Sequence, residues 1–108
     1  MDWYEIEYLY PKSYKKFVDT MFPNVGVVSI SILKNFDIKK LYNFFDKEGF
    51  YLILELNQNK NWSFLLRKDN WIIGNHCETK KTREEIEIVG FNYCFKQLEE
   101  SLNSKLKV

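Results

Sequence analysis

Alanine is absent from this sequence of 108 residues, and histidine and cysteine are scarce. The missing alanine fits an AT-rich genome and is evidence about origin rather than mechanism. Two cysteines, Cys77 and Cys94, are too few for the disulfide framework of a small secreted domain. No run approaches the roughly 20 uncharged apolar residues of a membrane-spanning helix. The N-terminal segment Met1-Asp2-Trp3-Tyr4-Glu5 has no basic region followed by an apolar core, so it does not resemble a secretory signal. We therefore expect a cytoplasmic protein with reduced thiols and no membrane association.

Histidine occurs once, as His76, directly before Cys77. Both residues fall on an expected strand, where neighbouring side chains point to opposite faces and do not readily form a nucleophile–base hydrogen bond. No cysteines or histidines have the spacing of a zinc site, and the glycines are isolated rather than gathered in a phosphate-binding loop. The sequence predicts no enzyme, no metal site and no cofactor. An enzyme assembled from scattered residues such as His76, Asp69 and Glu55 is the least favoured hypothesis.

Charge is nearly balanced, with 16 basic and 15 acidic residues and a net charge of +1. Nucleic-acid-binding proteins usually carry a clear basic excess that includes arginine, whereas only Arg67 and Arg83 are arginines here. The balance disfavours nucleic-acid binding as the main function. It remains the alternative hypothesis, because lysine pairs form local basic segments: Lys39, Lys40, Lys80, Lys81 and Arg83.

Two pairs of adjacent carboxylates, Glu84-Glu85 and Glu99-Glu100, lie on the last expected helix. The first pair falls in its opening turn, where negative charge complements the helix dipole. The second pair falls on its polar side. Both pairs are predicted to be solvated helix charges without an acid–base role.

The N-terminal region shows a helical pattern. Residues 3–22 carry apolar side chains at steps of three and four: Trp3, Ile6, Tyr10, Tyr14, Phe17 and Met21. Asp2 and Glu5 have the spacing of a capping box, and Pro11 must kink or restart the helix. We expect a kinked or two-piece helix, and a strand over residues 4–10 is the competing interpretation.

Strand patterns follow. Residues 28–32 and 50–56, a segment from Trp62 and a segment from Trp71 to about Cys77 alternate as strands do. The linkers between the last three are too short for crossovers, which predicts an antiparallel meander. Between the first two segments, Asp37 opens a short helix whose apolar side ends at Gly49, where a left-handed cap is expected.

The last helix is the clearest element. Thr82 and Glu85 form a capping box, and the helix runs from about Arg83 to Leu102 or beyond. One apolar row is expected to lie across the sheet: Ile88, Phe91, Phe95, Leu98 and Leu102. A second row on the opposite side predicts another contact, either with the N-terminal helix or with a partner protein: Ile86, Val89, Gly90 and Tyr93.

Together these patterns predict a single α+β domain over residues 1–108. Its expected architecture is a four-stranded, mostly antiparallel sheet with helices packed on it, in the order α-β-α-β-β-β-α. The predicted core comprises Phe17, Ile30, Phe44, Leu52, Leu54, Phe64, Phe91, Phe95 and Leu98.

Three segments also carry a resemblance. They are Tyr10-Pro11-Lys12-Ser13-Tyr14-Lys15-Lys16-Phe17, residues 41–49, and the tail that begins Thr82-Arg83-Glu84-Glu85. The chain resembles small uncharacterised phage proteins of the kind found in phages of gut Bacteroidetes. Such tails normally carry alanines where this sequence has Val89, Gly90 and Cys94. The resemblance implies a phage or mobile-element origin, with the host cytoplasm as location, and brings no assigned activity.

The first functional hypothesis is therefore a small, non-enzymatic protein-binding module, either a phage accessory protein acting on a host factor or a homodimer. The expected partner is another protein or a second copy of the chain.

Overall fold

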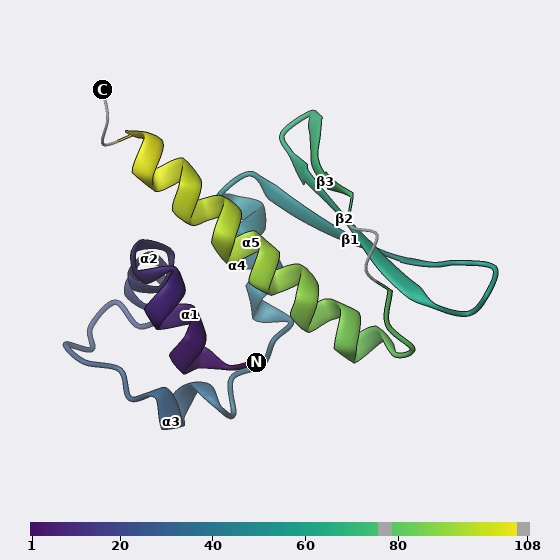
Figure 1. The fold of residues 1–108 in the computed structure, drawn as a ribbon. Coiled ribbons are helices and arrows are strands. Elements are labelled where there is room, and N and C mark those ends of the chain that lie inside the picture. The colour runs from purple at the N-terminus through teal and green to yellow at the C-terminus, as the bar shows by residue number, and fades with distance from the viewer. Residues whose placement is uncertain (76–78, 106–108) are drawn as a thin grey trace.

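The hydrophobic periodicity of the sequence accounts for all but one of the regular elements. A computed structural model describes residues 1–75 and 79–105 and has an α+β fold. Within these residues the helices are α1 (Trp3–Leu9), α2 (Pro11–Met21), α3 (Ile30–Leu33), α4 (Lys40–Lys47) and α5 (Arg83–Lys105). The strands are β1 (Phe50–Leu56), β2 (Trp62–Lys68) and β3 (Trp71–Asn75) (Figure 1).

The N-terminal region forms two helices that meet at Pro11, which confirms the two-piece interpretation. Asp2 caps α1, because its Oδ1 accepts a hydrogen bond of 3.1 Å from the amide of Glu5. Pro11 opens α2 at a position where a backbone N–H has no helical partner, so its missing donor is tolerated. The competing interpretation of residues 4–10 as a strand is wrong, since α1 covers most of them.

The described strands form one antiparallel meander in the order β1-β2-β3. β1 and β2 pair along their whole length, with Ile53 opposite Leu65. A bulge between Leu66 and Arg67 interrupts the pairing of β2 with β3. Gly49, which leads into β1, has a φ of 86°, so the predicted left-handed cap is confirmed.

A fourth strand predicted over residues 28–32 is wrong, and with it the order α-β-α-β-β-β-α. This segment contains α3, which Ser29 caps through a 3.2 Å hydrogen bond from the amide of Ser31 to its Oγ. α3 packs against α1, on the other side of α5 from the sheet (Figure 1). A strand at this place would lie out of reach of the ladder that it was expected to join.

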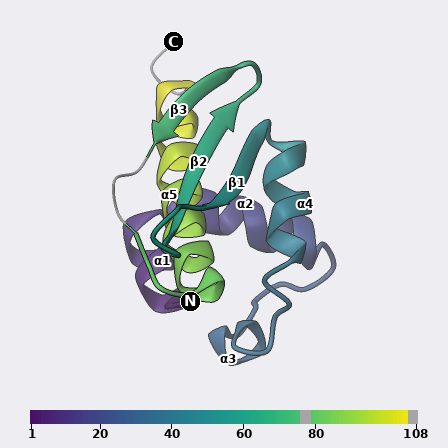
Figure 2. The ribbon, with the colours of Figure 1, turned by 90° about the vertical axis from the view of Figure 1, so that its right-hand side faces the viewer.

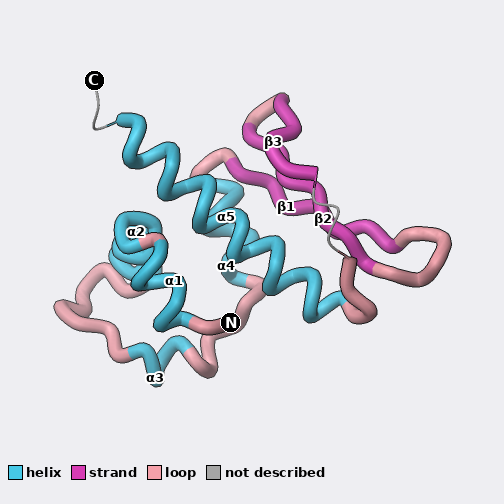
Figure 3. Tube along the Cα trace, viewed as in Figure 1, coloured by secondary structure: helices cyan, strands magenta, loops and turns pink. Residues whose placement is uncertain are grey.

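Helix α5 lies between the sheet and the α1–α2 pair, so the fold has three layers (Figure 1). In Figure 2 the sheet stands in front of α5, while α1 and α2 lie behind it. α4 packs against β1, where the rings of Phe45 and Phe50 meet edge-on at 6.5 Å. Figure 3 shows the loops that link α2 to α3 and β1 to β2. α5 is therefore buried on two sides.

The core surrounds α5. Phe95 on α5 meets the rings of Trp3, Phe17 and Phe45 edge-on at 6.0, 5.8 and 5.0 Å. Most of the predicted core is confirmed as buried: Phe17, Phe44, Leu52, Phe64, Phe91, Phe95 and Leu98. Ile30 and Leu54 are partly buried against the same cluster. Among the described residues, no helix is long and apolar enough to cross a membrane.

Candidate functional site

A cleft opens between the segment that leads into α4 and the first turns of α5. Its volume is about 470 Å³, and its lining residues are Ile38, Lys39, Tyr42, Arg83, Glu84 and Glu87. Residues 38–42 form one wall. Arg83 and Glu87 are one helical turn apart on α5 and therefore share the wall that faces it.

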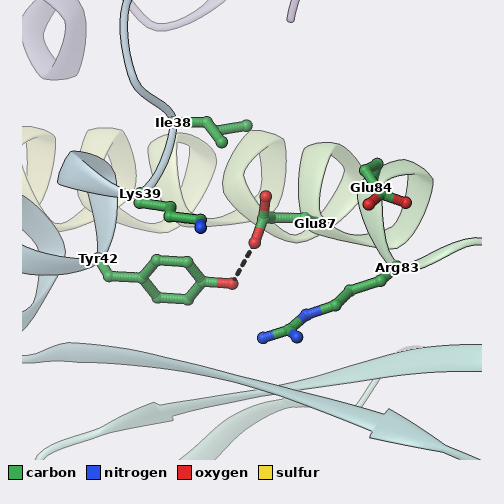
Figure 4. Close-up of a pocket in the computed structure, with 6 residues that line it drawn as sticks. All are labelled: Ile38, Lys39, Tyr42, Arg83, Glu84 and Glu87. Atoms are coloured by element: carbon green, nitrogen blue, oxygen red, sulfur yellow. Dashed lines mark hydrogen bonds between the residues drawn. The ribbon is translucent and has the colours of Figure 1, made fainter.

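A hydrogen bond joins the two walls. The Tyr42 hydroxyl donates to Oε2 of Glu87 at 2.7 Å (Figure 4). Glu87 is only 9% exposed, and a carboxylate at such a depth requires hydrogen bonds or nearby charges. The ring of Tyr42 packs edge-on against Phe91 with centroids 4.8 Å apart, which fixes the phenol in place.

Two cations face this bond. The amine of Lys39 and the guanidinium of Arg83 both point toward the Tyr42–Glu87 pair (Figure 4). Arg83 also lies over the ring of Trp62, with its guanidinium carbon 5.9 Å from the centroid. Within residues 1–75 and 79–105, neither Lys39 nor Arg83 forms a salt bridge. Their charges are therefore available to a ligand.

The electrostatics of Tyr42 favour binding over proton transfer. Burial raises the pKa of Tyr42 above its ordinary value, and the hydrogen bond and charge of Glu87 raise it further, while Arg83 lowers it. The phenol therefore stays protonated at neutral pH and acts as a hydrogen-bond donor. A general base or nucleophile would need the opposite shift of its pKa.

The residues predicted to bind a partner lie against the chain's own sheet. Ile86 and Gly90 are buried and Val89 and Tyr93 are half-buried. A Cβ on Gly90 would lie 2.8 Å from Cδ1 of Leu52, and the Tyr93 hydroxyl donates a 3.1 Å hydrogen bond to the carbonyl of Ile73. This stripe makes its contacts within the chain, so of the two predicted alternatives it does not form an exposed surface for a partner protein.

The two apolar rows of α5 have exchanged their expected neighbours. The row with Phe91 and Phe95, predicted to face the sheet, instead meets rings from α1, α2 and α4. The row with Gly90 faces β1, because a residue without a side chain lets the helix approach Leu52 closely. One of the two contacts expected for the second row was a contact with the N-terminal helix. The first row makes that contact instead, through Phe95.

The residues of the nucleic-acid alternative are distributed around the cleft. Lys39 and Arg83 line it, while Lys40 and Lys81 are exposed. Lys80 pairs with Trp62 through two backbone hydrogen bonds of 2.7 and 2.9 Å. The cations of the cleft are balanced by Glu84 and Glu87, so its lining carries no net charge.

His76 and Cys77, which were not expected to form a catalytic pair, lie outside the described residues. The other thiol, Cys94, is fully buried on α5, and burial raises its pKa, which keeps it an unreactive thiol. Among the residues that the structure describes, no group of three or more histidine, cysteine or acidic side chains is arranged to hold a metal ion.

A second surface feature is the outer sheet face, which we define as the side of the sheet turned away from α5. Tyr51 and Ile53 of β1 are 40% and 38% exposed there, and Ile72 of β3 is 62% exposed. On the middle strand β2, Leu65 lies opposite Ile53 of β1. Arg67 of β2 lies opposite Tyr51 of β1 and Ile72 of β3. Apolar side chains that are adjacent across strands form an uncovered patch on this face.

Sequence reasoning missed both features, although each left a signal. Glu87 stands four residues before Phe91 on an apolar row of α5, where a carboxylate requires an explanation. The segment 50–56 is apolar on both faces rather than on one, which indicates that its second face is also meant to be covered.

Comparison with protein-family models, with curated proteins and with solved structures finds no match for this chain.

Proposed function

We propose that this chain is a non-enzymatic protein-binding module that pairs with a second copy of itself through β1. The observation that carries the proposal is the contrast between the two edges of the sheet. Edge strands that are left open normally carry devices against pairing, such as short length, bulges, prolines or charges. β3 has one of them among the described residues, since its ladder with β2 is bulged.

β1 has none of these devices apart from one charge. It is seven residues long, runs Phe-Tyr-Leu-Ile-Leu-Glu-Leu, and has neither proline nor glycine. Among the described residues its only strand partner is β2. α4 contacts the inner face of β1 through the rings of Phe45 and Phe50, and it stands beside β1 on the side away from β2 (Figure 2). An apolar edge strand of this length is suited to adding another strand.

The sequence of β1 suits a twofold antiparallel pairing centred on Ile53. In that register Ile53 meets Ile53 of the second copy on the outer sheet face, and Tyr51 meets Glu55. On the inner face Leu52 meets Leu54. The only charged residue of β1, Glu55, lies opposite a tyrosine hydroxyl and not opposite another carboxylate. Apolar pairs of this kind each contribute about 0.2–1 kcal/mol beyond the backbone hydrogen bonds.

The test is the solution mass, measured by light scattering, of the wild type and two variants. Ile53→Glu places two carboxylates opposite each other at the twofold axis, so we expect it to be a monomer. Ile72→Glu is the matched control, because it puts the same charge on the outer sheet face at β3, away from the paired edge. We expect it to remain a dimer.

A charge exchange makes the test specific. Ile53→Lys alone should also be monomeric, whereas an equimolar mixture of the Ile53→Glu and Ile53→Lys chains should form a heterodimer. A wild-type protein that stays monomeric up to its solubility limit would contradict the proposal. So would a dimer that Ile72→Glu dissociates and Ile53→Glu does not.

Nucleic-acid binding is the second candidate. One observation supports it: Lys39 and Arg83 line the same cleft, and Lys40 and Lys81 are exposed. Binding through Lys39, Lys40, Lys80, Lys81 and Arg83 should weaken steeply with salt. The absence of any binding to labelled single-stranded or double-stranded oligonucleotides at low salt would remove this candidate.

A further inference from the structure

We infer that the cleft between α4 and α5 binds a small zwitterion, an α-amino acid or the end of a short peptide, which carries an ammonium and a carboxylate close together. This inference does not depend on pairing through β1, because the residues of the cleft are separate from those of the paired edge. It rests on the charges of the cleft, on the fixed position of Glu87 and on the size of the space.

The charges of the cleft select for a ligand with both signs. Lys39 and Arg83 supply two positive charges, and Glu84 and Glu87 supply two negative ones. A simple anion would gain the two cations but would lie against the carboxylate of Glu87, and a simple cation would meet the guanidinium of Arg83. A zwitterion can satisfy both, because its carboxylate suits the planar fork of Arg83 and its ammonium suits Glu87.

Glu87 is placed for this role before any ligand arrives. Its Oε2 accepts the hydrogen bond of Tyr42, and the side chain points into the cleft toward Lys39 (Figure 4). No hydrogen bond to its Oε1 is made by the described residues. A carboxylate that is nine-tenths buried and held by a tyrosine loses little conformational freedom when it binds an ammonium.

The space and its apolar wall set the size and type of side chain. A volume of about 470 Å³ lies within the usual range for small-molecule sites and accommodates an amino acid or a dipeptide. Ile38 and the ring of Tyr42 supply the apolar part of the lining. This combination fits an aliphatic side chain, so leucine is the natural first probe.

Calorimetric titration with four probes tests the inference: leucine, leucyl-leucine, leucinamide and N-acetylleucine. Leucinamide lacks the carboxylate, and N-acetylleucine lacks the ammonium. We expect leucine or leucyl-leucine to bind. The two derivatives should have affinities at least about tenfold lower. Tighter binding of leucine identifies a free amino acid as the ligand class, and tighter binding of leucyl-leucine identifies a peptide terminus.

Two variants assign the two charges of the ligand to their residues. Arg83→Gln should weaken leucine about tenfold and should not weaken leucinamide, which has no carboxylate to lose and is freed from the repulsion of the guanidinium. Glu87→Gln keeps an acceptor for Tyr42 and should weaken leucine about as much. It should not weaken N-acetylleucine, which has no ammonium to lose and is freed from the repulsion of the carboxylate. Lys81→Gln, an exposed lysine outside the cleft, is the control and should change none of these affinities.

Circular dichroism shows whether each variant is folded, and the exposed Arg83 carries the test alone if Glu87→Gln unfolds. The inference is overturned if none of the four probes binds the wild type. It is also overturned if leucinamide and N-acetylleucine bind as tightly as leucine, or if Arg83→Gln leaves the affinity for leucine unchanged.

Discussion

The backbone amide of Ser13 donates a 2.8 Å hydrogen bond to Oε1 of Glu99, and the Ser13 hydroxyl donates a 2.9 Å hydrogen bond to the carbonyl of Phe95. Ser13 lies in the first turn of α2, and the N-cap of that helix, Tyr10, makes no side-chain hydrogen bond. The first amides of a helix have no partner within it. α5 therefore supplies the cap that α2 lacks.

We predict that Glu99→Ala lowers the free energy of unfolding by about 1–3 kcal/mol, because it leaves the buried amide of Ser13 without an acceptor. Urea denaturation followed by circular dichroism measures the change. Glu100→Ala is the matched control, since Glu100 is exposed on the same helix and should change stability by no more than about 0.5 kcal/mol. Equal effects of the two substitutions would contradict the capping role of Glu99.

Phe95 joins α5 to both N-terminal helices through its ring contacts. It is fully buried and meets three other rings. We expect Phe95→Ala to cost about 3–5 kcal/mol, through lost apolar burial and the cavity that remains. Thermal unfolding measures the loss, with the exposed neighbour Lys96→Ala as reference. A shift as small as that of Lys96→Ala would show that the placement of α5 is incorrect.

Gly90→Ala sets helix propensity against packing. Alanine favours a helix interior by about 1 kcal/mol over glycine, but its Cβ would stand 2.8 and 2.9 Å from the two methyl carbons of Leu52. Overpacking of a core costs about 1–3 kcal/mol, so we expect net destabilisation.

Two further variants check that cause. Gly26→Ala should not destabilise, because nothing lies within 4 Å of the added carbon. In a Leu52→Ala background the clash is absent, and Gly90→Ala should become stabilising. If Gly90→Ala destabilises both backgrounds equally, contact with Leu52 is not the cause.

Tyr42 should make stability sensitive to alkaline pH. Because burial and Glu87 raise its pKa in the folded protein, the folded state holds the phenol proton where the unfolded chain has lost it. This stabilisation is complete below the ordinary tyrosine pKa of about 10 and is lost as pH rises through the folded-state pKa. Urea midpoints measured above pH 9 should therefore fall more steeply for the wild type than for Tyr42→Phe. Parallel curves would show that this proton makes no contribution.

Local signals predicted most of the elements, because caps and turns depend on a few neighbouring residues. Thr82 and Glu85 make both hydrogen bonds of their predicted box, at 2.9 and 3.2 Å. Pro11 restarts the helix where its missing N–H demands it. The three meander strands begin at the predicted residues, since alternation over seven residues leaves little choice of face.

What could not be predicted depends on residues far apart in the sequence. α5 is apolar on two sides, and only the fit of Gly90 against Leu52 decides which side meets the sheet. Glu99 was expected on the solvated side, but its partner Ser13 is 86 positions away and buries it. The short alternation at 28–32 fits a helical turn as well as a strand, and its position behind α1 decides the outcome.

The candidate site shows the same division. The sequence singled out Lys39 and Arg83 as basic residues of possible function. That they line the same cleft depends on how the segment leading into α4 packs near α5. Tyr42 and Glu87 lie 45 positions apart, and nothing in either local segment indicates the bond between them.

The central place of α5 has a consequence for how a ribosome delivers this chain. The helical layer and the sheet each pack on α5, and α5 is synthesised after both. Until α5 leaves the exit tunnel, the N-terminal helices and the sheet have no common helix to pack on. Side chains that the complete fold buries, among them Phe17 of α2 and Phe64 of β2, are then exposed. The fold is therefore completed in one late step, after α5 has left the exit tunnel.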